Sequence, residues 1–240
     1  MRLKDLDILT SRAELAKLPE GKLLINTINA FSYDNARKDA MFSEALQKGG
    51  VLIPDGISIV KACRFLNAKS QPKERIAGWD LFEFEMERLN KRGGKVMFLG
   101  SSDAVLGLIR QKMPEIYPGI EVDTYSPPYK SEFSAEDNDA MVSAINRSNP
   151  DLLWIGMTAP KQEKWAYKHL DRLEVHCHIG TIGAVFDFFA GTVKRAPECW
   201  QKAGMEWLYR LLAEPRRMWR RYFIGNAKFL YYIMVEKIMG

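Results

Sequence analysis

One carboxylate, Asp55, stands at the turn inside VLIPDGISIVKACRFL (51–66), between an apolar run and an amphipathic run. An aspartate at that place commonly caps the following helix through its side-chain oxygen. Asp55 also follows an expected strand, and parallel sheets bind ligands beyond the carboxyl ends of their strands. A carboxylate in such a position can accept a proton from a substrate. The segment therefore leaves helix capping and catalysis as two alternatives.

Other polar groups also lie where strands are expected to end. FLGSSDAVL (98–106) predicts a strand, a Gly-Ser-Ser turn and a helix start, which either binds phosphate or forms a plain tight turn. It matches neither GxGxxG nor a Walker loop. In GMTAPKQE (156–163), Gln162 either contacts a base or sugar or faces solvent. His176 and His178 share one strand face, but two histidines without a third ligand do not predict a metal site, so we expect no metal.

The elements that would position these groups alternate along the chain. Apolar runs predict strands over 22–27, 51–53, 95–100, 120–126, 151–157 and 174–180. Amphipathic stretches predict helices over 33–49, 57–66, 80–94, 103–113, 134–149 and 160–170. Strands separated by single helices indicate an α/β fold, a Rossmann-like and mostly parallel sheet flanked by helices.

The last fifth of the chain differs in composition from the rest. Net charge is +5, and residues 195–240 hold nine Lys or Arg against four Asp or Glu, so residues 1–194 are neutral overall. We therefore divide the chain into an α/β core (1–194) and a basic, aromatic C-terminal appendage (195–240). Interleaved aromatics and arginines favour either a helix in a membrane interface or a helical layer packed on the core. A nucleic-acid- or membrane-binding module without catalysis is the alternative function.

The motifs, taken in order, resemble the WecG/TagA/CpsF family of bacterial glycosyltransferases. The similarity runs from about Thr27 to Arg221 and so covers most of the chain. The segments that carry it are Thr27-Ile-Asn29, PDGISIV (54–60), RIAGWDLF (75–82), FLG (98–100), GMTAPKQE (156–163), GTIGAVFDFFAGTVKRAP (180–197) and EWLYRLLAEPRR (206–217).

This resemblance implies an inverting, metal-independent enzyme without a cofactor. It would move a hexose or N-acetylhexosamine-type sugar from a UDP-sugar to a polyprenyl-diphosphate-linked saccharide, for a cell-surface polysaccharide. The resemblance also implies a cytoplasmic enzyme that lies peripherally on the inner face of the cell membrane, through the C-terminal appendage, and it allows homo-oligomers. The scattered Cys63, Cys177 and Cys199 fit a reducing compartment.

The resemblance also assigns roles to residues. Asp55 would be the general base that deprotonates the acceptor hydroxyl, with Thr27 and Asn29 beside it and Gln162 on the donor or acceptor. Arg210, Arg217 and Arg220 would close over the donor, where cations must stabilise the leaving diphosphate in place of a metal. The matched motifs supply the remaining substrate-binding residues: Gly56, Arg75, Asp80, Gly100 and Gly183.

Two segments depart from the family pattern. DTYSPPYKSEFS (123–134) replaces an expected Gly-Tyr-Phe turn, and NAFSYDNA (29–36) differs after Thr-x-Asn. Both departures leave the identity of the sugar open. A nicotinamide-dependent oxidoreductase is a further alternative, but it would need GxGxxG after the first strand, and TINAFS does not supply that motif.

Overall fold

The computed structural model describes residues 1–197, 199–200, 205–213, 215–219 and 223–239, without the side chains of residues 210, 217 and 218. Six strands form one sheet in the order β2-β1-β6-β5-β3-β4, and all neighbours pair in parallel. The strands are β1 (Leu23–Ile28), β2 (Val51–Pro54), β3 (Gly94–Gly100), β4 (Ile120–Tyr125), β5 (Leu152–Gly156) and β6 (His178–Thr181). The predicted α/β fold with a mostly parallel sheet is confirmed.

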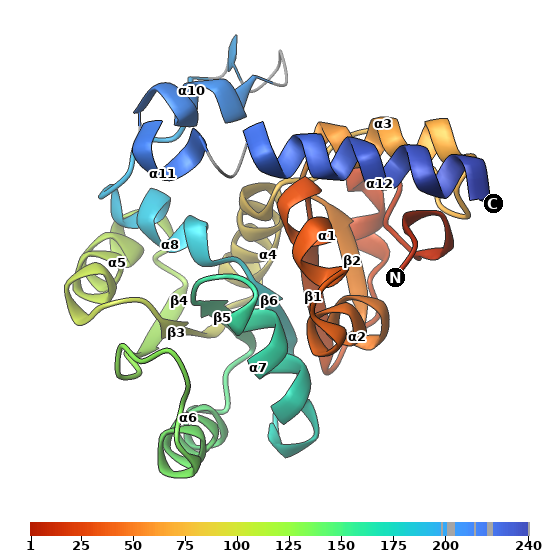
Figure 1. Ribbon diagram of the computed structural model, residues 1–240. Coiled ribbons are helices and arrows are strands. Elements are labelled where there is room, and N and C mark those ends of the chain that lie inside the picture. The colour runs from red at the N-terminus through yellow and green to blue at the C-terminus, as the bar shows by residue number, and fades with distance from the viewer. Residues whose placement is uncertain (198, 201–204, 214, 220–222, 240) are drawn as a thin grey trace.

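Helices cover both faces of this sheet, as Figure 1 shows. One face packs against α4 (Gly78–Arg92), α5 (Asp103–Ile116) and α8 (Gly183–Ala190). The other packs against α6 (Ala135–Ser148) and α7 (Lys161–His169). Successive strand residues point to opposite faces, so in β5 Trp154 joins the first cluster and Leu153 the second. Burial on both sides explains why the central strand β5 is a continuous apolar run, whereas the edge strand β4 is mostly half-buried and carries Glu121 and Asp123.

A third apolar cluster lies around the β1–β2 edge. The helices that build it are η1 (Leu3–Asp5), α1 (Ala30–Ala36), α2 (Ala40–Lys48), α3 (Ile57–Leu66) and α12 (Gly225–Met239). Phe229 and Ile233 of α12 are buried among them, and the rings of Phe229 and Tyr33 meet edge to face with centroids 5.5 Å apart. The last helix is thus a part of this core cluster.

The helix predicted over residues 33–49 is two helices. The break falls after Ala36, and α2 begins at Ala40 with Asp39 as its N-cap, whose carboxylate accepts the N–H of Phe42 at 3.0 Å. Asn29 similarly caps α1. The apolar spacing is continuous across the break, and for this reason periodicity predicted one helix. The side chains of Asn29 and Asp39 each cap a helix start, so the segment forms two helices.

The strand predicted over residues 174–180 begins four residues later and forms β6. Val175 and Cys177 are nevertheless buried in the cluster under α6 and α7, so their apolar character reflects packing of the approach to the strand. Cys177 and Cys63 are buried thiols, and burial raises the pKa of each to about 12, which keeps both protonated. Cys199 is exposed.

The C-terminal part contains α10 (Glu206–Ala213), α11 (Pro215–Trp219) and α12. In Figure 1, α12 crosses α1 and α3, and α10 and α11 are drawn beyond α8. Glu236 fastens α12 to the beginning of the chain, because its carboxylate accepts the N–H groups of Leu3 (3.0 Å) and Lys4 (2.7 Å) and the hydroxyl of Tyr33 (2.7 Å). Among the described residues, no helix combines the length and apolar character needed to cross a membrane.

Replacing Glu236 with Ala is expected to destabilise the fold by about 3 kcal/mol, because it leaves two backbone donors and the Tyr33 hydroxyl without their acceptor in a buried place. Denaturant unfolding measures this change, and limited proteolysis should cut first within residues 225–239. Glu115→Ala, at an exposed position of α5, is the matched control. Equal unfolding midpoints for the two variants would contradict the predicted fastening role of Glu236.

Candidate active site

The ends of β1 and β2 bring three predicted residues together. Ile28 lies opposite Pro54, so Asn29 and Asp55 follow neighbouring strands. The N–H of Asp55 donates to the carbonyl oxygen of Ile28 at 2.9 Å. A Cβ at Gly56 would lie only 3.3 Å from Cβ of Asn29, so the two strand ends pack closely. Asp55, Gly56 and Asn29 therefore form one end of the expected ligand edge.

Asp55 does not occupy the N-cap position of α3. Gly56 does, and it provides no side-chain capping bond. Oδ1 of Asp55 instead accepts from Nη2 of Arg75 at 3.1 Å, and 26% of the Asp55 side chain is exposed. Gly56, and not Asp55, is thus the N-cap of α3, and the Asp55 carboxylate is partly exposed at the edge where parallel sheets commonly bind ligands.

Arg75 connects two carboxylates. Its Nη1 donates to Oε2 of Glu206 at 2.8 Å while its Nη2 donates to Asp55, and the N–H of the next residue, Ile76, donates to the carbonyl of Pro54 at 3.0 Å. Burial acts to lower the pKa of Arg75, but Asp55 and Glu206 together raise it above its ordinary value. The guanidinium is therefore charged at every working pH and is engaged by the protein itself.

Asn29 and Thr27 have different positions relative to the end of β1. Oδ1 of Asn29 accepts the N–H groups of Phe31 and Ser32 at 3.1 and 3.0 Å, so its side chain starts α1. Thr27 is half-buried within β1, opposite Ile53, one residue before the strand ends. Asn29 is at the edge itself, and Thr27 is one layer below it.

Gln162 joins the ends of β5 and β6. Its Oε1 accepts the N–H of Met157 at 3.0 Å, and its Nε2 donates to Oε1 of Glu163 at 2.9 Å. A Cβ at Gly183 would lie 2.8 Å from that Oε1 and 2.4 Å from the carbonyl oxygen of Met157, so only glycine fits at the start of α8. Gln162 is buried, and the alternative in which it faces solvent is wrong.

Gly100 ends β3 at the point where the chain connections change direction. The chain leaves β3 toward β4 and leaves β5 toward β6, on opposite sides of the sheet order. Gly100 lies opposite Gly156 with a φ of +124°, and a Cβ there would stand 2.2 Å from the carbonyl oxygen of Gly156. Such a reversal opens a crevice in doubly wound sheets. Ser102 then caps α5 by accepting the N–H of Val105 at 3.4 Å.

Asp80 has a different position from the other predicted residues. Its Oδ2 accepts the N–H of Ala77 at 2.7 Å and pairs with Nη2 of Arg12 at 3.1 Å. These contacts fix the first turn of α4. That turn packs closely on the β6–α8 turn, as a Cβ at Gly78 would lie only 3.2 Å from Ile182. Asp80 thus orders the start of α4 through contacts with protein groups.

The predicted arginines of the appendage lie at the limit of the described chain. Arg210 belongs to α10 and Arg217 to α11, but their side chains are outside the description, and Arg220 lies outside the described residues altogether. Their assignment to the donor stays a prediction.

Three residues with unusual surroundings were missed by sequence reasoning. Glu206 holds Arg75, and Glu163 holds Gln162. Arg195 lies over the ring of Trp79, 5.2 Å from its centroid, and its buried Nε has no hydrogen-bond partner among the described residues. A signal existed for Glu163, which is three residues before Ala166 on the buried side of α7.

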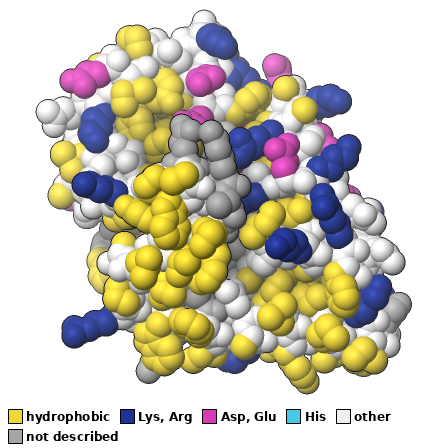
Figure 2. All heavy atoms as spheres, turned by 90° about the horizontal axis from the view of Figure 1, so that it is seen from above, with side chains coloured by type: hydrophobic (Ala, Val, Ile, Leu, Met, Phe, Trp, Pro, Cys, Tyr) yellow, Lys and Arg dark blue, Asp and Glu magenta, His cyan; other side chains and the backbone are white. Residues whose placement is uncertain are grey.

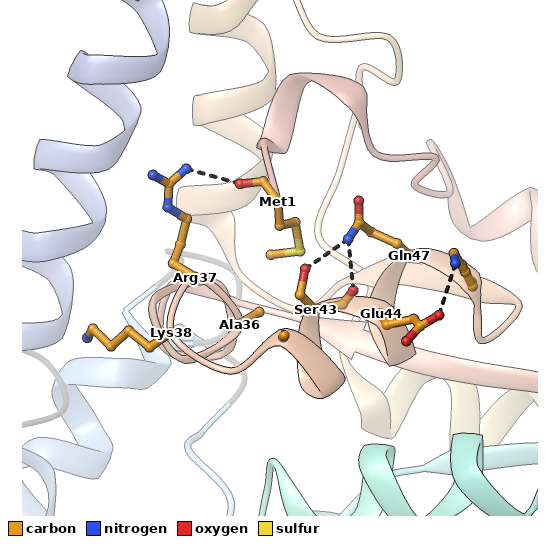
Figure 3. A pocket seen from close by; sticks show the side chains of 9 residues that line it. Met1, Ala36, Arg37, Lys38, Ser43, Glu44 and Gln47 are labelled. Atoms are coloured by element: carbon orange, nitrogen blue, oxygen red, sulfur yellow. Dashed lines mark hydrogen bonds and ion pairs between the residues drawn. The ribbon is translucent and has the colours of Figure 1, made fainter.

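Figure 3 shows a pocket that is separate from these residues. It is lined by the chain start and by α1 and α2, including Arg37, Ser43 and Gln47. Arg37 donates to the carbonyl of Met1 at 3.0 Å, and Gln47 donates to the Ser43 hydroxyl at 2.8 Å. Most polar groups of this pocket are thus engaged with each other, Lys38 pairs with Asp34 outside it, and none of the predicted site residues lines it.

No group of three His, Cys, Asp or Glu side chains in the described ranges is arranged to hold a metal ion. His176 lies before β6 and is exposed, so the prediction that the two histidines share one strand face is wrong. His178, the first residue of β6, contacts Oε1 of Glu85 at 2.8 Å through Nδ1 and the carbonyl of Pro19 at 2.9 Å through Nε2. That histidine thus has a structural role. The expected metal independence stays a prediction.

Glu163→Gln is expected to change the pH dependence of stability. Burial raises the pKa of Glu163 to about 7, against its hydrogen bond from Gln162, and Oε2 has no partner among the described residues. The raised pKa means that protonation of Glu163 favours the folded state. This contribution to the free energy of unfolding is fully present below pH 4.5 and is lost as pH rises through about 7. Glutamine does not titrate, so this variant should exceed the original protein at pH 8 by up to about 3 kcal/mol, and by less at pH 5. Urea unfolding at both pH values measures the difference, with exposed Glu132→Gln as control; parallel pH profiles would count against it.

Comparison of the sequence with known proteins provides information that is independent of this geometry. Residues 3–240 match the Glycosyl transferase WecG/TagA/CpsF family. An N-acetylglucosaminyldiphosphoundecaprenol N-acetyl-beta-D-mannosaminyltransferase of Bacillus subtilis (strain 168) is 32% identical over 198 residues, which cover 82% of this chain and 74% of that protein. The protein of the same name from Bacillus spizizenii (strain ATCC 23059 / NRRL B-14472 / W23) is 30% identical over 218 residues, 90% of this chain and 81% of that protein. The match over nearly the whole length shows that this chain belongs to the WecG/TagA/CpsF family of glycosyltransferases.

Proposed function

We propose that this protein transfers an N-acetylhexosamine, with N-acetylmannosamine as the first candidate, from a UDP-sugar to a polyprenyl-diphosphate-linked saccharide, with inversion and without a metal. The names of both relatives support N-acetylmannosaminyl transfer to an N-acetylglucosaminyl-diphospho-lipid. The observation that carries the proposal is the partly exposed carboxylate of Asp55, fixed by Arg75 where the ends of β1 and β2 meet.

Asp55 acts as the general base in this proposal. Its carboxylate takes the proton of the acceptor hydroxyl as that oxygen attacks the anomeric carbon of the donor sugar. The bond from this carbon to the diphosphate oxygen breaks in the same step, so UDP leaves and the anomeric configuration inverts. A well-placed base of this kind contributes about 10²–10⁴-fold to the rate.

Cationic side chains stabilise the departing diphosphate in the absence of a metal. Arg210 takes this role together with Arg217 and Arg220, the other two arginines that the family resemblance assigns to the donor. Of the three, Arg210 is on α10, whose first residue, Glu206, is bound by Arg75. Arg195 is a further candidate, because its buried Nε has no hydrogen-bond partner in the described part of the chain and is a donor that an anionic oxygen would satisfy. Arginine suits diphosphate because its planar fork donates two parallel hydrogen bonds.

The helices α10 to α12 provide a surface for the membrane that holds the acceptor. Exposed large apolar side chains on these helices are Trp207, Leu212, Trp219, Leu230, Tyr231, Met234, Ile238 and Met239. Figure 2 shows hydrophobic groups gathered on this face, with Lys and Arg side chains among them. Apolar groups bounded by cations fit an interface with anionic lipid, so we place the enzyme peripherally on the inner face of the cell membrane.

Asp55→Asn is expected to lower UDP release by about 10²–10⁴-fold, because the amide cannot accept the hydroxyl proton. The assay uses UDP-N-acetylmannosamine and other UDP-sugars, a short-chain lipid-diphosphate N-acetylglucosamine, vesicles, and EDTA. Asp7→Asn, at a surface ion pair, is the matched control and should retain full turnover. Undiminished release by Asp55→Asn would move the base to another residue, and abolition by EDTA would disprove metal independence.

Charge placed on the exposed face of α12 is expected to weaken membrane binding. Leu230 and Met234 are 62% and 51% exposed, so Leu230→Glu with Met234→Glu should leave the fold intact. Co-sedimentation with anionic vesicles should fall at least ~10-fold, because carboxylates repel the lipid and replace apolar contacts. Ile116→Glu, exposed on α5, serves as control. Equal sedimentation of both variants would place the membrane surface elsewhere.

A further inference from the structure

We propose that Glu206 is a positioning residue of the active site, which acts through Arg75 on the carboxylate of Asp55. This inference rests on the proposed role of Asp55 as general base. It adds to that role a link between the helix α10 and the reacting groups, with the guanidinium of Arg75 as the connection.

The burial of Glu206 is the first reason. In α10, Trp207 and Leu212 are exposed, whereas the Glu206 side chain is only 10% exposed. None of the described residues of α10 belongs to the three apolar clusters. A carboxylate is costly to bury without a partner. The contact with Arg75 therefore explains why this helix docks with an acidic residue inward.

The geometry of Arg75 is the second reason. Its guanidinium is a rigid plane, so a nitrogen held by Glu206 at 2.8 Å determines where the other nitrogen stands, 3.1 Å from Oδ1 of Asp55. The backbone beside it is fixed by the hydrogen bond from Ile76 to Pro54. Three charged groups from three separate parts of the chain thus form one row with a single cation in the middle.

The position of α10 is the third reason. Glu206 is its first residue, and Arg210, one turn further, is a predicted donor-binding residue. The same helix thus bears a residue for the donor and a residue that sets the acceptor's base. Docking of α10 then orients Asp55 when the donor arginine is in place, and departure of α10 removes one of the two carboxylates that hold Arg75.

The experiment measures turnover of the full-length protein on vesicles, with Glu206→Ala, Arg75→Ala and the double variant, and with Asp55→Asn in parallel. Glu206→Ala should lower kcat about 10- to 100-fold with less than ~3-fold change in the donor KM. The reason is that displacing the base by about 1 Å slows proton transfer but leaves the contacts that bind the donor in place. Glu206→Gln, which keeps an acceptor oxygen, should recover part of kcat. The double variant should match Arg75→Ala alone, since Glu206 acts through Arg75.

The matched control is Glu74→Ala, which removes the neighbouring carboxylate paired with Arg12 and should leave kcat unchanged. A Glu206→Ala enzyme with unchanged kcat would overturn the inference, as would effects that multiply in the double variant. Full activity of Asp55→Asn would overturn the proposed base, and this inference with it. Loss in Asp55→Asn with full activity in Glu206→Ala would overturn only the role of Glu206.

Discussion

The parallel pairing of β1 with β2, and of β1 with β6, is the constraint on which the site depends. Parallel strands end at the same edge of the sheet. The strand pairing therefore brings residues from distant parts of the chain together there, and no direct attraction between those residues is needed. Asn29 and Asp55 become neighbours only because Ile28 lies opposite Pro54. A shift of one residue in this register would turn the apolar side chains of β2 to the wrong faces of a doubly buried sheet. Burial of these apolar side chains therefore also fixes the relative positions of Asn29 and Asp55 at the edge of the sheet.

The fold could be predicted from the sequence where apolar runs are bounded by turns. β3 and β5 are of this kind, and the turn at Asp55 follows from the alternation of strand and helix. The boundaries were less predictable where capping decides them, as at Asp39, or where a buried approach resembles a strand, as at Val175. A single capping hydrogen bond can start a new helix inside a continuous apolar pattern. The sequence pattern alone does not show whether such a bond forms.

The site could be predicted only in part, for a related reason. Asp55 and Asn29 directly follow strands and Gln162 lies in the first turn of the helix after one, places that sequence patterns locate. Glu206 is separated from Arg75 by 131 residues, and nothing in its local sequence indicates a buried partner. Asp80 shows the opposite case. It was predicted to bind substrate from its place in a motif, but its carboxylate accepts the N–H of Ala77 at the start of α4. Pairing between remote charges is a property of the tertiary arrangement and has no period to detect.

Glu236 connects the two ends of the described chain through bonds that span 233 and 232 residues. The cluster around the β1–β2 edge is therefore incomplete during synthesis until residues 229–236 have left the ribosome, although its strands are among the first to emerge. Contacts of such long sequence separation form late because the intervening loop must close first. The edge that carries Asp55 and Asn29 thus acquires its final packing only after residues 229–236 have been synthesised.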